Sequence, residues 1–293
     1  MDSVLACLPP GSRVALVRLR SLGDCVLTTP ALDILKRFRP DLHIAIVVED
    51  RFRSVFEGNP GLDEIIAPRI SALRRFHPDL CINFHGGTRS AWMTLLSGAR
   101  YRAGFAHYRH QFPYNVRIPR AQEILHLDRK VHTAEHLASA MFYLGVPICE
   151  IPRATIGDGR VPKEPVAVIH PVAATPAKTW SAANFLRVAD HLRSSGLDPI
   201  FIGAPADDLT PFHPTLQASL ADLKALLARA TLFVGNDSGP AHMAAAFGLP
   251  VVVLFGASDR EIWHPWRTIC EVLPLSAAPE QVIEALSRLK VAA

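Results

Sequence analysis

Residues 232–256 read LFVGNDSGPAHMAAAFGLPVVVLFG, and this stretch decides the fold. Its pattern predicts a strand over Leu232–Val234, a tight loop, a helix over Ala241–Phe247 and a second strand over Val251–Phe255. Both strands are apolar throughout, which is typical of parallel strands covered by helices on both faces. The stretch therefore predicts a strand–helix–strand unit of a parallel sheet.

The loop between this strand and the helix carries Asp237, Ser238, Gly239 and Pro240. Asp237 or Ser238 can cap the free amides of the helix, and Pro240 suits its first turn. At the C-terminal end of a parallel strand, such a loop turns backbone N–H groups and the positive end of the helix dipole toward an anion. Two interpretations stay open: a diphosphate-binding turn, or one more strand–helix–strand unit with a polar loop.

Strands and helices alternate along the rest of the chain, which predicts a doubly wound parallel sheet in each half. The other expected strands are Arg13–Leu19, His43–Val48, Glu64–Ile66, Asp79–Phe84, Tyr101–Phe105 (as an edge strand), Val166–Ile169 and Pro199–Ile202. The other expected helices run to about Phe38 (with Thr29 and Pro30 as its N-cap and first turn), and over 51–57, 90–97, 133–144, 182–194, 220–228 and 280–290. Residues 106–131 are expected to be irregular.

The proline-rich segment 148–165 has no hydrophobic periodicity and is the expected linker between two domains, 1–155 and 156–293. A chain of 293 residues has the length expected for two domains. The net charge of +4 suits a phosphate-bearing ligand or an anionic membrane surface, but it is too small and dispersed to indicate nucleic acid.

The cysteine pattern and the hydropathy favour a cytoplasmic protein. Five cysteines are scattered along the chain and never form CxxC pairs, which fits a reducing compartment and predicts no metal site. No stretch approaches the ~20 apolar residues of a membrane span, and the N-terminus lacks a signal-peptide pattern. We therefore expect a soluble cytoplasmic protein.

Asp24 follows the first expected strand, next to Gly23, which permits close backbone approach. Its carboxylate can act as a general base toward an attacking hydroxyl, or it can simply cap the helix that follows. His85 and Arg89 follow the expected strand Asp79–Phe84. They either line an acceptor pocket or belong to an ordinary hydrated loop.

Thr175 and Lys178 precede a helix in the second half, where a lysine can reach a bound phosphate or remain solvated. His242, one turn into the helix after Ser238, either faces the same anion or is a structural group. Asp207 either binds ribose hydroxyls or lies on a loop surface. The sequence has no GxGxxG turn opening a helix, no P-loop and no HExxH, so no dinucleotide, P-loop or zinc-protease site is supported.

Taken together, these residues resemble glycosyltransferase family 9, the ADP-heptose:lipopolysaccharide heptosyltransferases. The segments that carry the resemblance are VRLRSLGDCVLTTP (17–30), Asn59-Pro60 with DEII (63–66), His132 and Glu135 through Gly145, His170-Pro171 with AKTW (177–180), and FVGNDSGPAH (233–242). The resemblance implies a GT-B fold, in which two Rossmann-like domains face each other across a cleft that holds the active site.

The same resemblance implies an inverting, metal-independent transfer of a heptose from ADP-heptose to a hydroxyl of a lipopolysaccharide core or related glycan. Asp24 would be the base, and Lys178 and the Asp237–Gly239 turn would hold the diphosphate, with Thr175 and His242 near it. The ADP-sugar is then a substrate, and no cofactor is expected. The acceptor would be a lipid-linked oligosaccharide, with at most peripheral membrane contact at the inner face of the inner membrane.

Two other functions remain open from the sequence. A nucleotide-sugar epimerase or hydrolase on the same fold would consume the donor without an acceptor. A non-catalytic protein built on a decayed transferase would bind a sugar nucleotide without turnover.

Overall fold

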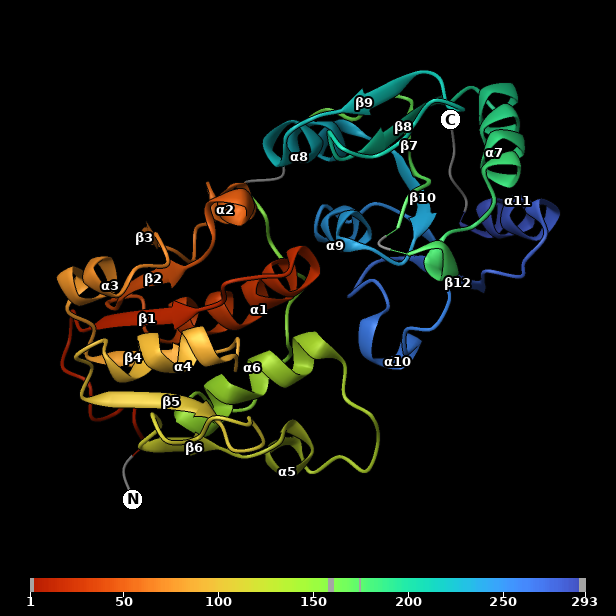
Figure 1. Ribbon diagram of the computed structural model, residues 1–293. Helices are drawn as coiled ribbons and strands as arrows, with labels where there is room; N and C mark the ends of the chain where they lie inside the picture. Colours follow the sequence, from red (N-terminus) through yellow and green to blue (C-terminus); the bar gives the residue numbers. More distant parts are fainter. Residues whose placement is uncertain (1–2, 158–160, 174, 290–293) are drawn as a thin grey trace. The chain divides into compact units, whose positions relative to one another are not determined.

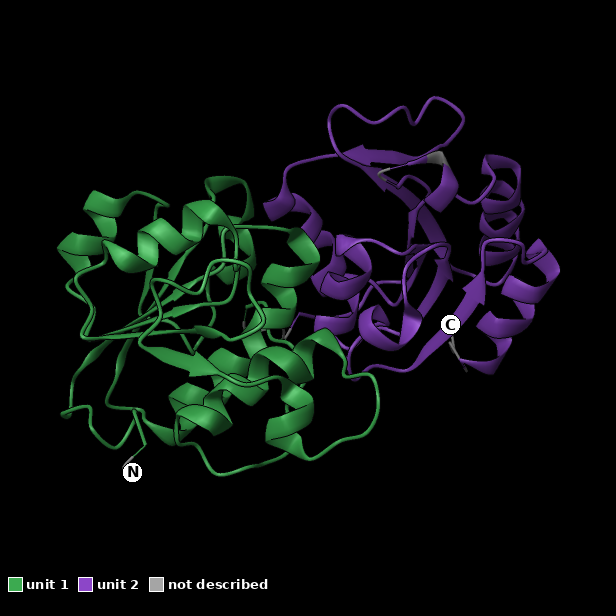
Figure 2. Ribbon diagram, turned by 60° about the horizontal axis from the view of Figure 1, so that its bottom comes forward, with its two compact units in different colours: residues 1–158 green, residues 159–293 purple. Residues whose placement is uncertain are grey.

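The computed structural model describes residues 3–157, 161–173 and 175–289. The chain divides into two compact units, Met1–Asp158 and Gly159–Ala293 (Figure 2). The division falls inside the proline-rich segment 148–165, where the strand and helix pattern of the sequence is interrupted.

Unit 1 is built on one sheet of six parallel strands in the order β3-β2-β1-β4-β5-β6 (Figure 1). Its strands are β1 (Arg13–Val17), β2 (His43–Val47), β3 (Glu64–Ile66), β4 (Leu80–Asn83), β5 (Tyr101–Phe105) and β6 (Val116–Ile118). Its helices are α1 (Leu22–Phe38), η1 (Asp50–Phe52), α2 (Arg53–Phe56), α3 (Ile70–Phe76), α4 (Thr88–Leu95), α5 (Ala121–Leu125) and α6 (Thr133–Leu144).

Helices cover both faces of this sheet. Leu73 and Phe76 of α3 and Met93 of α4 belong to one buried cluster with Val17 and Cys81 of the central strands. The α1 helix connects β1 to β2, whereas α3 and α4 connect strands in the opposite direction across the sheet. Because crossovers between parallel strands are right-handed, α1 lies on the other face of the sheet. There it packs beside α6 (Figure 1).

Unit 2 repeats this plan with six parallel strands in the order β12-β11-β10-β7-β8-β9. Its strands are β7 (Val166–His170), β8 (Asp198–Gly203), β9 (Thr215–Gln217), β10 (Leu232–Asn236), β11 (Val251–Phe255) and β12 (Cys270–Pro274). Its helices are η2 (Pro176–Lys178), α7 (Ala182–Ser194), α8 (Leu220–Arg229), α9 (Gly239–Ala246), α10 (Arg260–Trp263) and α11 (Pro279–Arg288). The expected α/β class, with two doubly wound parallel sheets, is confirmed.

The strand order reverses once in each sheet. In unit 1 the reversal lies between β1 and β4, and in unit 2 it lies between β7 and β10. At such a point the two chains leave the sheet toward opposite faces, so a crevice opens outside the carboxyl ends of the strands. Each unit therefore has one preferred place for a ligand.

The start of α1 differs from the expectation. The helix begins at Leu22, with Ser21 and Asp24 forming a reciprocal capping box, so Thr29 and Pro30 lie inside it rather than at its start. Pro30 has no N–H for the carbonyl of Val26 four residues earlier. The Thr29 hydroxyl donates to that carbonyl at 2.8 Å instead, which explains how the helix continues through the proline.

Residues 106–131 are less irregular than expected, because they contain β6 and α5. The presence of β6 makes β5 an interior strand rather than an edge strand. The sequence pattern also missed α3, β9, α10 and β12, all of them short or only partly buried. The last helix, expected over 280–290, runs over Pro279–Arg288, and Lys290 lies outside the described residues.

The substitution Thr29→Val should lower the free energy of unfolding by about 1–3 kcal/mol, because it leaves the buried Val26 carbonyl without a donor. It also removes the oxygen that accepts from the Thr155 amide at 2.9 Å. In a Pro30→Ala background the new amide can bond Val26, so the cost of Thr29→Val should fall by about 1 kcal/mol. Urea unfolding of the four proteins measures this coupling, and an equal cost in both backgrounds would contradict it.

Candidate active site

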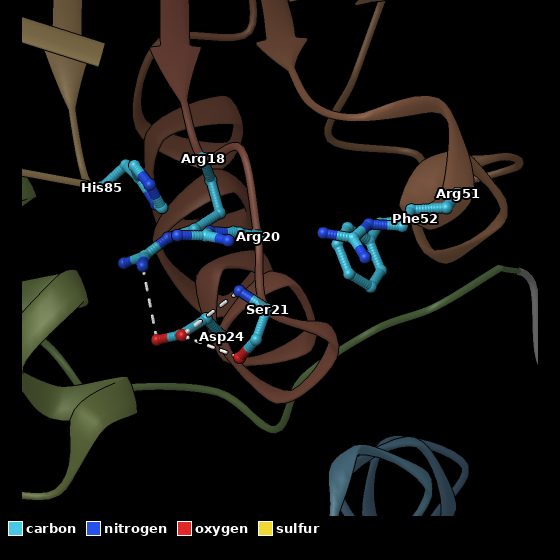
Figure 3. Close-up of a pocket in the computed structure, with 7 residues that line it drawn as sticks. All are labelled: Arg18, Arg20, Ser21, Asp24, Arg51, Phe52 and His85. Atoms are coloured by element: carbon cyan, nitrogen blue, oxygen red, sulfur yellow. Dashed lines mark hydrogen bonds and ion pairs between the residues drawn. The ribbon is translucent and has the colours of Figure 1, made fainter. Parts of the chain in front are cut away.

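A cavity of about 460 Å³ opens in unit 1 where the strand order reverses (Figure 3). It is lined by three residues that follow β1, by the second residue after β4, by one residue of α1 and by two residues of η1: Arg18, Arg20, Ser21, His85, Asp24, Arg51 and Phe52. Three of the seven are arginines and one is a carboxylate. The arginines can therefore bind an anionic molecule in the cavity, and the carboxylate can accept a proton from a hydroxyl there.

Asp24 reaches this cavity from the first turn of α1. Its Oδ2 accepts a hydrogen bond from the Ser21 hydroxyl at 3.0 Å, and its Oδ1 lies 3.3 Å from Nη1 of Arg18 (Figure 3). The Asp24 side chain remains 23% exposed, whereas that of Arg18 is only 7% exposed. The carboxylate thus caps the helix and also faces the cavity, so the two roles considered from the sequence are compatible.

Arg18 is the most buried cation of the cavity. Its Nε makes no hydrogen bond to any residue that the structure describes, although the guanidinium pairs with Asp24. The ion pair of 3.3 Å holds the Asp24 carboxylate in position at the cavity.

His85 lies beside Arg18 at the end of β4 (Figure 3). Its pKa is lowered, first by burial and then by the positive charge of Arg18, so the imidazole is neutral near pH 7. The side chain of Asn83 holds this turn by accepting from the amides of His85 and Gly86 at 2.9 and 3.0 Å. Gly86 has φ of 71°, and a Cβ there would lie 2.8 Å from the Tyr108 ring, so the turn needs glycine.

Two residues expected near this site do not line the cavity. Arg89 donates to the carbonyl of Pro68 at 2.8 Å and lies 3.5 Å from Glu49. Gly23 lies in the first turn of α1 and is not among the lining residues. Sequence reasoning missed Arg18, Arg20, Arg51 and Phe52, although an arginine directly after an apolar strand was a usable signal.

In unit 2, the corresponding reversal brings His170 and Ser238 together. The Ser238 hydroxyl and Nδ1 of His170 share a hydrogen bond of 3.0 Å. Burial lowers the pKa of His170 to about 4, against a smaller opposite effect of Asp207. Gly235 permits this approach, because a Cβ there would lie 2.9 Å from that of His170.

The N-terminus of α9 keeps amides available for an anion. Ser238 is the N-cap residue, but its side chain does not bond the helix amides, contrary to the expected capping, because its hydroxyl is engaged by His170. Within the described part of the chain, the amides of Ser238 and Gly239 donate no hydrogen bond, while the Asp237 amide donates to Leu254. Two such N–H groups at a helix start can donate hydrogen bonds to an anion.

Lys178 ends the short helix η2, and its Nζ donates to the Ser258 hydroxyl at 2.8 Å, after the end of β11. Gly256 lets η2 approach this strand end, because a Cβ at Gly256 would lie 2.9 Å from the carbonyl of Ala177. Thr175 is exposed, and its carbonyl accepts from the Lys178 amide at 3.0 Å.

The other two expected residues of unit 2 are more constrained. His242 is 5% exposed on α9. The Asp207 carboxylate accepts from the Ala204 amide at 2.6 Å and so closes its own turn after β8. Asp207 thus takes part in a hydrogen bond within the loop after β8.

The described ranges lack a metal-binding cluster and a membrane-spanning helix. No group of three or more His, Cys, Asp or Glu side chains is placed to hold a metal ion there. None of the helices in these ranges combines the length and apolar character that crossing a bilayer requires.

A family model and a curated relative that match this chain both carry the description heptosyltransferase. The model of glycosyltransferase family 9 (heptosyltransferase) matches residues 69–290. The chain is 26% identical over 294 residues to lipopolysaccharide heptosyltransferase 3 of Escherichia coli, covering 85% of this chain and 84% of that protein.

Solved structures share the fold over nearly the full chain. The family 9 glycosyl transferase of Veillonella parvula DSM 2008 superposes with a TM-score of 0.82 at 24% identity, over 95% of this chain and 97% of that one. The E. coli heptosyltransferase WaaC with ADP gives a TM-score of 0.79 at 18% identity, over 94% and 99%.

The buried His170 should make unit 2 acid-sensitive. The unfolded chain binds a proton at His170 near pH 6.5 and the folded chain only near pH 4, so stability is lost as the pH falls through this window. Relative to His170→Asn, which keeps a hydrogen-bonding side chain, wild type should lose about 2–3 kcal/mol between pH 7 and pH 4.

Urea unfolding at a series of pH values measures this difference. His136, whose pKa is also lowered to about 4 by burial, is present in both proteins and cancels. Parallel pH dependences of the two proteins would show that His170 does not titrate as described.

Proposed function

This chain belongs to glycosyltransferase family 9, and we propose that it transfers a heptose from ADP-heptose to a hydroxyl of a lipopolysaccharide core or related glycan. The proposal covers the donor, the acceptor and the residue roles. Its main support is the Asp24 carboxylate, which is paired with Arg18 and exposed to a cavity at the strand reversal of unit 1.

In the proposed reaction, Asp24 accepts the proton of the acceptor hydroxyl as its oxygen attacks the anomeric carbon of the heptose. The bond from that carbon to the β-phosphate oxygen breaks, and ADP leaves with the bonding electrons. The sugar passes through a state with oxocarbenium character, as at other glycosidic centres, and attack opposite the leaving group inverts the configuration. Arg18 orients the carboxylate through the 3.3 Å ion pair.

The departing diphosphate gains negative charge, and unit 2 supplies the groups that can stabilise it. We assign this role to the Lys178 ammonium and to the Ser238 and Gly239 amides, with Asp237, Thr175 and His242 around them. Preorganised donors aimed at developing charge lower the barrier without rearrangement. The charge is then balanced by protein groups, and the proposed transfer needs no metal ion and no cofactor besides its sugar nucleotide substrate.

The remaining assignments belong to the same proposal. His85 and the arginines of the cavity contact the acceptor, with Gly23 and Arg89 at its margin, and Asp207 contacts the ribose. The first domain, 1–155, then carries the base and the acceptor, and the second, 156–293, carries the donor. With a lipid-linked acceptor, the enzyme acts at the cytoplasmic face of the inner membrane through peripheral contact.

The variant Asp24→Asn should reduce transfer by at least about a hundredfold, because an amide cannot accept the proton. Binding of ADP-heptose should change little, since the donor contacts lie in unit 2. The matched control is Asp33→Asn on the same helix, where the carboxylate pairs with Arg37 on the surface.

Product formation and donor consumption are measured separately, with a chelator present and absent. Normal turnover by Asp24→Asn would remove this residue from the mechanism. Donor consumption without acceptor would favour the epimerase or hydrolase, and donor binding without any turnover would favour the non-catalytic protein.

The variant Lys178→Ala should weaken binding of ADP-heptose by about 1–3 kcal/mol, the cost of losing a charged hydrogen-bond partner. Calorimetry measures this loss, with UDP-, GDP- and CMP-sugars as tests of the base. Lys163→Ala is the control, because Lys163 is in the same unit and donates to the Ala228 carbonyl instead. Equal affinities of the two variants would contradict the assigned role of Lys178.

A further inference from the structure

Three large apolar side chains are exposed together on unit 1. Trp92 and Leu96, four residues apart on and just after α4, are 49% and 42% exposed, and Phe112 is 54% exposed. The rings of Trp92 and Phe112 meet edge to face, with centroids 5.4 Å apart. We name Trp92, Leu96 and Phe112 the aromatic patch.

The patch is held in place by the fold. Ala91 and Met93, on either side of Trp92 in the sequence of α4, are buried, and Met93 belongs to the cluster on the sheet. The loop that carries Phe112 is tied down at two points: His110 Nε2 lies 2.9 Å from the Thr88 hydroxyl, and Arg102 donates to the Pro113 carbonyl at 2.9 Å. Two segments far apart in sequence thus present one apolar surface.

The chain segment that carries this patch has charged side chains of a single sign. Residues 80–122 contain no aspartate and no glutamate, although the whole chain has 27 of them. The same residues include six arginines: Arg89, Arg100, Arg102, Arg109, Arg117 and Arg120. Glu49, from outside the segment, faces Arg89, while Arg109 and Arg117 are exposed. The net charge of the whole chain, +4, does not reveal this local excess of positive charge.

We propose that the aromatic patch and its arginines dock unit 1 on a bilayer that contains anionic phospholipids; the inference rests on the proposed use of a lipid-linked acceptor. Tryptophan and phenylalanine are favoured where an apolar body meets a hydrated headgroup layer. Arginines nearby are attracted to the negative surface of an anionic membrane. A nucleic acid would satisfy the arginines but offers no apolar phase to Leu96.

The position of the patch suits this role. Helix α4 follows directly after the turn of His85, Gly86 and Gly87, and His85 lines the cavity of Asp24. The docking surface and the proposed base are therefore carried by the same compact unit. A bilayer bound there brings a lipid-linked hydroxyl to the unit that activates it.

Vesicle cosedimentation of the full chain tests the proposal, with phosphatidylcholine vesicles that contain or lack phosphatidylglycerol. Wild type should bind only the anionic vesicles, and the double variant Trp92→Ala/Phe112→Ala should bind roughly tenfold more weakly. Ile269→Ala is the matched control, because Ile269 is 66% exposed in unit 2. Arg109→Gln/Arg117→Gln should weaken binding and flatten its dependence on salt.

A second measurement protects against misfolded variants. Brominated phospholipid should quench part of the tryptophan fluorescence of wild type, and the conservative Trp92→Phe should retain vesicle binding while losing this quenching. Equal vesicle binding by wild type and the double variant, or vesicle binding that does not depend on phosphatidylglycerol, would each overturn the proposal. No donor or acceptor is present in these assays, so failure of the proposed transfer and failure of docking are distinguishable.

Discussion

The site geometry depends on one constraint of parallel sheets: where the strand order reverses, neighbouring chains must leave toward opposite faces. In unit 1 this constraint separates the chain after β1 from the chain after β4 and opens the cavity that Asp24 and His85 share. In unit 2 it sets His170 beside Ser238 at the ends of β7 and β10. The same topology thus produces two polar sites from unrelated side chains.

The two sites differ in how they manage charge. In unit 1 a buried arginine pairs with a partly exposed carboxylate, and both side chains line the cavity. In unit 2 burial keeps His170 neutral, and this leaves its ring to hold the Ser238 hydroxyl away from the helix amides. The amides of Ser238 and Gly239 then carry the positive potential of the helix start. The proposed proton transfer therefore belongs to unit 1 and the proposed anion binding to unit 2.

Elements with strong apolar patterns could be predicted almost residue by residue. The strand Val251–Phe255 and the helix Ala182–Ser194 have the expected bounds, because buried strands and amphipathic helices impose their period on the sequence. Prediction was wrong where local signals competed. At α1, Thr29 and Pro30 resemble a helix start, but the capping box of Ser21 and Asp24 sets the true start, and its N-cap Ser21 lies eight residues before Thr29. Short elements such as β6 are defined by pairing with β5, which no local pattern encodes.

The sequence by itself determined the α/β class, the two-part division of the strand pattern and the motifs that mark the family, since these follow from periodicity and from local turn chemistry. It also singled out Asp24, Ser238 and Gly239 as residues at strand ends. Only the tertiary structure decided which side chains meet there: Arg18 pairs with Asp24, and Arg89 turns instead to Glu49 and Pro68. The physical reason is that these contacts join segments separated by many residues, and their partners are chosen by strand order and packing, which a one-dimensional pattern does not contain.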